Sequence, residues 1–139
     1  MTTSLYRRAG LKPGTSMAEF ALILIPCLTL FFAIINFALA LYSYDFVGYS
    51  AQAAARYAMV HGATAAQTAS ASDVKNYVTG LVAGGFDTTL LTVSTTWAPD
   101  NKPGSVVTVT VGYTFKPLTG LVSAVNINLS QTAAMVISQ

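Results

Sequence analysis

Charged side chains are scarce in this sequence of 139 residues: seven are Lys or Arg, five are Asp or Glu, and together they make up 9% of the chain. An ordinary soluble domain carries about 25%. Hydrophobic residues make up 53%, so the chain is not intrinsically disordered, a state that requires low hydrophobicity and high charge. The few cations form no basic face of the kind that binds nucleic acid. We predict no nucleic-acid partner.

Residues that carry chemistry are equally few. The single Cys, Cys27, lies inside an apolar run, and the single His, His61, lies near the end of a predicted helix. One Cys excludes an intrachain disulfide, and one His with scattered acids lacks the convergent ligands of a metal site. Glycine-rich phosphate-binding motifs are also missing. The sequence therefore predicts no metal, no cofactor and no enzymatic activity.

What the sequence does contain is one long uncharged run, residues 20–44. A helix needs about 20 apolar residues to cross a bilayer, so we predict a membrane span over about 20–44. Arg7, Arg8 and Lys12 all lie on its N-terminal side. The positive-inside rule therefore places the N-terminus in the cytoplasm and the rest of the chain beyond the membrane.

Two other interpretations of this run stay open. A buried core helix is one, although a small protein has little room to surround a helix that is apolar on every face. A secretory signal peptide is the other, because Ala38-Leu39-Ala40 fits an A-x-A cleavage site and Arg7-Arg8 is a twin-arginine pair. The run is longer than the usual 7 to 15 apolar residues of such signals.

The junction before the run reads as a basic leader ending in Lys12, then Gly14, four residues, Glu19 and Phe20. It resembles a type IV prepilin. This resemblance implies that a prepilin peptidase cuts after Gly14, so that residues 1–14 are a leader and Thr15 becomes the first residue. It also implies that Glu19, followed by Phe20, sets the register of assembly by meeting the N-terminal amine of a neighbouring subunit. An acid at the edge of a membrane span is a functional candidate on physical grounds as well.

Local backbone chemistry offers a second interpretation of the same residues. Ser16 or Thr15 would cap the helix, with Glu19 as the capping-box partner of Ser16. Both interpretations can hold together. Gly14 suits a peptidase that needs an extended backbone, and Pro13 is expected to keep the leader extended.

Within the prepilin class, two segments resemble TadE-like pseudopilins of the tight-adherence (Flp) pilus. The first is Glu19-Phe20-Ala21-Leu22 with a following Pro26, and the second is Ala53-Ala54-Ala55-Arg56-Tyr57-Ala58. The resemblance implies a minor pilin of the bacterial inner membrane, with a single pass and a periplasmic C-terminus, that reaches the cell surface if it enters a pilus. The implied partners are a prepilin peptidase, other pilin or pseudopilin subunits bound through the N-terminal helix, the inner-membrane assembly machinery and the lipid bilayer. The chain continues far beyond its helix, which favours a minor subunit. A main structural subunit and a secreted binding module released after Ala40 remain alternatives.

The long helix is expected over residues 15–61, starting at about Ser16 and ending before Gly62, with a kink at Pro26. Aromatic side chains recur along one face and are expected to pack against a sheet: Tyr42, Phe46, Tyr49 and Tyr57, with Ala53 between them. Alanines 51, 54, 55 and 58 form a small-residue face that suits close approach of a neighbouring helix. Arg56 and Asp45 share a face and are candidates for pairing between subunits.

Residues 62–139 are expected to form an exported α+β domain. A short helix is predicted over 71–82, capped by Ser70 or Ser72 and ended by Gly84-Gly85. Period-two alternation predicts strands over 91–97, 107–115 and about 127–137. These strands should form a three-stranded antiparallel sheet with its apolar face against the long helix and an outer face of Thr, Ser and Asn. The predicted fold class is α+β, with helix and sheet segregated.

Overall fold

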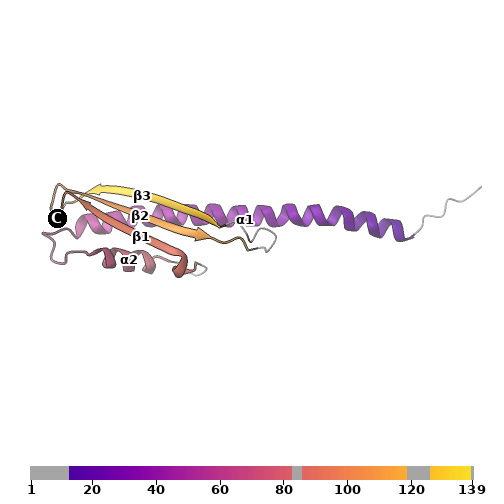
Figure 1. Ribbon diagram of the computed structural model, residues 1–139, viewed down its shortest axis with the longest axis horizontal. Helices are drawn as coiled ribbons and strands as arrows, with labels where there is room; N and C mark the ends of the chain where they lie inside the picture. The colour runs from indigo at the N-terminus through magenta and orange to yellow at the C-terminus, as the bar shows by residue number, and fades with distance from the viewer. Residues whose placement is uncertain (1–12, 83–85, 119–125, 139) are drawn as a thin grey trace, which may run out of the picture. The chain divides into compact units, whose positions relative to one another are not determined.

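The computed structural model describes residues 13–82, 86–118 and 126–138, with side chains from Ser16 onward. The chain divides into two units, Met1–Ile35 and Asn36–Gln139. The elements are α1 (Pro13–Val60), α2 (Ala71–Gly80), a 3₁₀ turn η1 (Thr88–Leu90), β1 (Leu91–Ala98), β2 (Val106–Phe115) and β3 (Ile127–Val136) (Figure 1). This layout confirms the α+β class. Because α1 runs through both units, each part of it is described with its own unit.

The start of α1 differs from the prediction. The helix begins at Pro13, three residues before the expected Ser16. Proline suits the first helical position because its missing N–H would have no partner there anyway. Ser16 and Thr15 are therefore inside the helix, and the prediction that either one caps it is wrong. The expectation of an extended backbone at Pro13 is also wrong. Farther along, helical structure continues across Pro26, and the kink there stays a prediction.

Helix α2 begins with Ser70 as its cap, one of the two candidates that the sequence predicted, and Asp73 completes a capping box. The Ser70 hydroxyl accepts a hydrogen bond from the Asp73 backbone N–H (3.3 Å), and Asp73 Oδ2 accepts one from the Ser70 backbone N–H (2.9 Å). The helix ends at Gly80, two residues short of the predicted end. The expected Gly84-Gly85 stop lies outside the described residues. Two of its side chains, Val74 and Val78, are fully buried.

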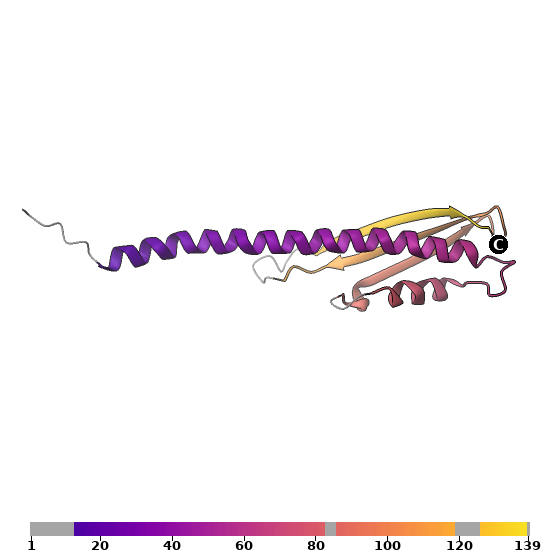
Figure 2. The same cartoon turned by 180° about the vertical axis from the view of Figure 1, so that it is seen from behind.

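The sheet has the order β1-β2-β3, and both pairs are antiparallel, as predicted. Val111 pairs with Val93 on one side and Gln131 on the other, so the odd-numbered residues of all three strands share one face. That face points into the core. The even-numbered face is rich in Thr, Ser and Asn, and Thr110 and Thr132 join their hydroxyls across it (2.9 Å). In both views α2 lies beside β1, away from β3 (Figures 1 and 2).

The core lies in the second unit, between its part of α1, the sheet and α2. Its α1 side consists of Val47 and the alanines 51, 54, 55 and 58, which are at most 1% exposed; its sheet side includes Val107, Val109 and Val111, which are fully buried. The alanine face thus packs inside its own chain. The expectation that a neighbouring helix packs on this face is wrong, because the alanines are already buried against the core residues of their own unit.

The C-terminal end of β3 is tied back to the end of α1. The Ser138 backbone N–H donates to the Met59 carbonyl (3.1 Å), and the Ile137 N–H donates to the Ser105 carbonyl (2.8 Å). Gly104 N–H donates to the Ile137 carbonyl (3.0 Å) from a backbone with a positive φ of 92°, which favours glycine. The bond from Ser138 to Met59 therefore joins the last strand to the long helix across 79 positions of sequence.

Candidate assembly surfaces

The α1 segment of the first unit is apolar and uncovered. Large hydrophobic side chains such as Met17, Leu22 and Ile25 are exposed there. The most apolar 18-residue window of α1 has a mean hydropathy of 2.5, and none of it is buried. This exposure argues against the interpretation as a buried core helix, because soluble monomers rarely leave so large an apolar surface open. By length and composition the helix can cross a membrane, criteria that a signal sequence near the N-terminus also meets.

The candidate processing site lies in the first turn of α1. Gly14 and Thr15 both have helical backbone. The first four N–H groups of a helix have no partner within the helix, so this turn is held less firmly than those that follow.

Glu19 lies on the exposed surface of α1, one turn after the candidate processing site. It borders a shallow hollow of about 410 Å³ together with Ala18, Leu22 and Ile23, which are all apolar. Among the described residues, one ion pair is present, between Lys102 Nζ and Asp100 Oδ2 (3.5 Å). Within those residues, Glu19 therefore has no cationic partner. The adjacent Phe20 is 65% exposed.

The predicted aromatic stripe divides between two partners in the second unit. Phe46 stacks on Phe86 (ring centroids 4.4 Å apart), and Phe86 also meets Tyr42 at 5.5 Å. Tyr57 stacks on Tyr77 of α2 (4.6 Å). Neither stacking partner belongs to a strand, although Phe46 and Tyr57 also pack against the core cluster, which includes residues of β1 and β2. The alanines take the central position in the core.

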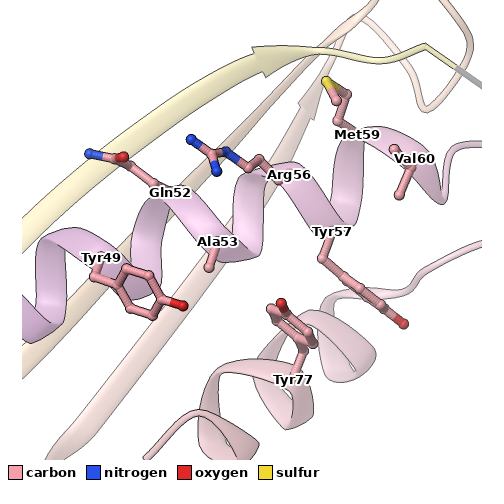
Figure 3. A pocket seen from close by; sticks show the side chains of 8 residues that line it. All are labelled: Tyr49, Gln52, Ala53, Arg56, Tyr57, Met59, Val60 and Tyr77. Carbon is pink, nitrogen blue, oxygen red and sulfur yellow. The ribbon is translucent and has the colours of Figure 1, made fainter.

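A groove opens on α1 beside α2, where the stripe is left uncovered (Figure 3). It has a volume of about 710 Å³ and is lined by Tyr49, Gln52, Ala53, Arg56, Tyr57, Met59, Val60 and Tyr77. Tyr49 is 65% exposed, and Arg56 is exposed as well. The contribution of Tyr77 to this groove was not recognised in the sequence.

Three exposed carboxylates at turns and caps are held by local hydrogen bonds. The Ser70 side chain, and then its backbone N–H, lower the pKa of Asp73 below its ordinary 3.8. The Thr89 side chain and backbone N–H do the same for the pKa of Asp87, with a smaller contribution from Lys116. The pKa of Asp100 is lowered first by the Ser105 hydroxyl. These acids stabilise turns, and within the described residues no three His, Cys, Asp or Glu side chains gather as metal ligands.

Among the described residues, one helix near the N-terminus is long and apolar enough to cross a membrane, and the rest form an α+β unit; this combination defines the class of protein. The family model for TadE-like protein matches residues 14–56. The matched segment contains Gly14, Glu19 and Arg56, and it confirms the predicted resemblance to the TadE-like family. No curated protein and no solved structure matches the chain. The match and the apolar helix together indicate a Tad pilus-associated protein.

Proposed function

We propose that this chain is a membrane-anchored minor pilin or pseudopilin that a prepilin peptidase cleaves after Gly14, and that it takes part in assembling a Tad/Flp-type adhesion pilus. One observation carries the proposal. Glu19 is a carboxylate without a cationic partner among the described residues, on an exposed apolar helix, five residues after Gly14 and inside the TadE-like segment. A helix that served only as an anchor would have no use for such an acid.

Cleavage after Gly14 would supply the missing partner. It would leave the α-amine of Thr15 at the start of the helix, as a positive charge at the membrane edge. Two unit charges 4 Å apart attract by about 4 kcal/mol at an effective dielectric of about 20. The amine of one subunit and the Glu19 carboxylate of the next would therefore favour one axial register of neighbouring helices. Without that pairing, moving the carboxylate into a helical bundle in lipid is unfavourable.

In this proposal the helix crosses the bacterial inner membrane once, with its N-terminus in the cytoplasm and the second unit in the periplasm. The basic leader residues support this orientation through the positive-inside rule. The partners are the prepilin peptidase, other pilin or pseudopilin subunits and the inner-membrane assembly machinery. The polar, uncharged outer face of the sheet is compatible with an exported unit.

Processing is tested by the N-terminal sequence and intact mass of the protein recovered from membranes of its own host. The proposal expects Thr15 at the N-terminus, and a Gly14→Val variant should retain the leader. Leu41 at the N-terminus would instead support a secreted module released after Ala40. A wild-type chain that keeps Met1 in a host with an active prepilin peptidase would refute processing.

Assembly is tested with Glu19→Gln, which keeps the size of the side chain and removes its charge. We expect normal insertion and normal cleavage but loss of piliation. The control is Asp100→Asn, which removes an exposed acid of the turn between β1 and β2, outside α1, and should leave piliation unchanged. Normal piliation in the Glu19 variant would contradict the assigned role. The stoichiometry of the chain in purified filaments then distinguishes a minor subunit from the main structural subunit.

A further inference from the structure

A separate apolar surface lies on the second unit, at the end where its polypeptide begins. The side chains that form it come from α1, from η1 and the residues just before it, and from the end of β2 and the residues that follow. They include Leu39, Tyr42, Phe86, Leu90, Phe115 and Leu118, which line an open hollow of about 450 Å³. Leu118 is 75% exposed. An exposed leucine beside an apolar hollow suggests that something covers this end of the unit.

A hydrogen bond fixes the position of Leu118 along α1. Its backbone N–H donates to Asn36 Oδ1 at 2.9 Å. Asn36 is the first residue of the second unit and directly follows Ile35. Leu118 therefore lies level with the point where the chain passes from the exposed apolar segment into the folded unit. This placement needs only the bond and the continuity of the chain.

The length of the apolar segment indicates where that point lies relative to a bilayer. As a helix, residues 20–35, which follow Glu19, extend about 24 Å, at 1.5 Å per residue. The hydrocarbon core of a bilayer is about 30 Å thick. These residues fill all but about one helical turn of it, so the outer boundary of the hydrocarbon core lies within about one turn of Asn36. Leu118, bonded to Asn36, lies at the same depth.

The side chains around Leu118 have the chemistry of a membrane interface. Phe37 and Leu41 are exposed on α1 just beyond Asn36, and Tyr42 beside them is exposed as well. Tyrosine is enriched at the level of lipid headgroups. The rim of the hollow carries one cation, Lys116, and one anion, Asp87. One charge of each sign next to apolar groups matches a headgroup layer, which also presents phosphates and amines.

We propose that this end of the second unit docks on the outer leaflet of the bilayer that α1 crosses, with Leu118 at the boundary between headgroups and acyl chains. The inference rests on the membrane anchoring of the proposed function. Docking holds the second unit against the membrane before the subunit is assembled. Entry into a filament then requires Leu118 and its neighbours to leave the lipid.

The test uses the full chain reconstituted in vesicles of phosphatidylethanolamine and phosphatidylglycerol. An environment-sensitive fluorophore is attached to one cysteine at a time: native Cys27, or Leu118→Cys or Lys102→Cys in a Cys27→Ser background. Lys102 lies in the exposed turn between β1 and β2, at the opposite end of β2 from Phe115, and is the aqueous control. Brominated lipids quench labels in the bilayer, and iodide quenches labels in water.

The proposal expects labels at positions 27 and 118 to be quenched by brominated lipids and not by iodide, and the label at 102 to show the reverse. A lipid-quenched label at 27 with a label at 118 as open to iodide as that at 102 would refute docking alone. A label at 27 that lipid does not quench would refute the membrane anchor and docking together. Protection of the label at 118 from both quenchers would show that protein covers this surface, which also overturns the proposal.

Discussion

Replacing Ala55 by Leu should destabilise the second unit by about 1–3 kcal/mol, the usual cost of adding methylenes to a well-packed core. Ala55 is completely buried, on the same α1 face as Ala51 and Ala58. The core on that face also contains Val109 of β2 and Val78 of α2. A larger side chain can enter only if α1 moves away from these partners.

For a domain of about this size, 1 kcal/mol shifts the melting temperature by about 4–8 °C. We therefore expect Ala55→Leu to melt at least about 4 °C below the wild type. Trp97 is the only Trp in the chain and packs, half-buried, against the core, so its fluorescence follows unfolding of this unit. The full chain is measured in detergent micelles, which cover the apolar segment of the first unit.

The matched control is Ala53→Leu, two residues earlier on α1. Ala53 is only partly buried and lines the open groove, where a leucine has room. Its effect should stay within about 0.5 kcal/mol, as for most surface substitutions. Equal melting temperatures for the Ala55 variant and the wild type would refute the packing argument. The alanine face would then again be a candidate contact between subunits.

Three further predictions concern single contacts. Asn36→Ala removes the acceptor of the Leu118 N–H. Because such a hydrogen bond contributes about 0.5–1.5 kcal/mol, hydrogen exchange at the Leu118 amide should become roughly 2- to 12-fold faster. Gly112→Ala places a Cβ 2.5 Å from the Thr92 Oγ1 and should lower the melting temperature. In a Thr92→Ala background, which removes this oxygen, Gly112→Ala should cost less free energy of unfolding, by about 0.5 kcal/mol or more. Purely additive effects of the two substitutions would contradict the clash. The pKa of Asp73 is lowered below 3.8 by the side chain, and then the backbone N–H, of its capping serine, so its contribution is present above about pH 4 and is lost as pH falls through the lowered pKa. Asp73→Asn should therefore melt lower than the wild type at pH 7 and lose less on acidification to about pH 2, whereas parallel melting curves at all pH values would contradict the capping role.

The strands and the short helix were largely predictable because their signals are local. Alternating Val and Thr in 107–115 define a half-buried strand, and the structure places β2 at Val106–Phe115. A serine before an apolar helical pattern is typical of a helix start, and α2 begins directly after Ser70. The short 3₁₀ turn η1 was not predicted, since a three-residue turn has no periodicity to detect.

The contact partners of α1 were harder to predict. A face of small residues permits close approach of any backbone, and sequence alone does not distinguish a helix of another subunit from the core of the same chain. The structure places Ala54 and Ala55 in that core. The aromatic partners Phe86 and Tyr77 were missed for a related reason, because ring stacking depends on how distant segments are brought together. The processing and register roles of Gly14 and Glu19 remain predictions from motif and chemistry.

The bond between Ser138 and Met59, which joins residues 79 positions apart, sets an order of events for an exported chain. In the proposed orientation, the alanine face of α1 is synthesised early, yet its unit cannot close until residue 138 has also crossed the membrane. The segment from 62 to 138 would then pass through the translocation machinery unfolded. During that interval the core face of α1 would be open, and the growing chain would depend on rapid transfer or on a periplasmic chaperone to avoid aggregation.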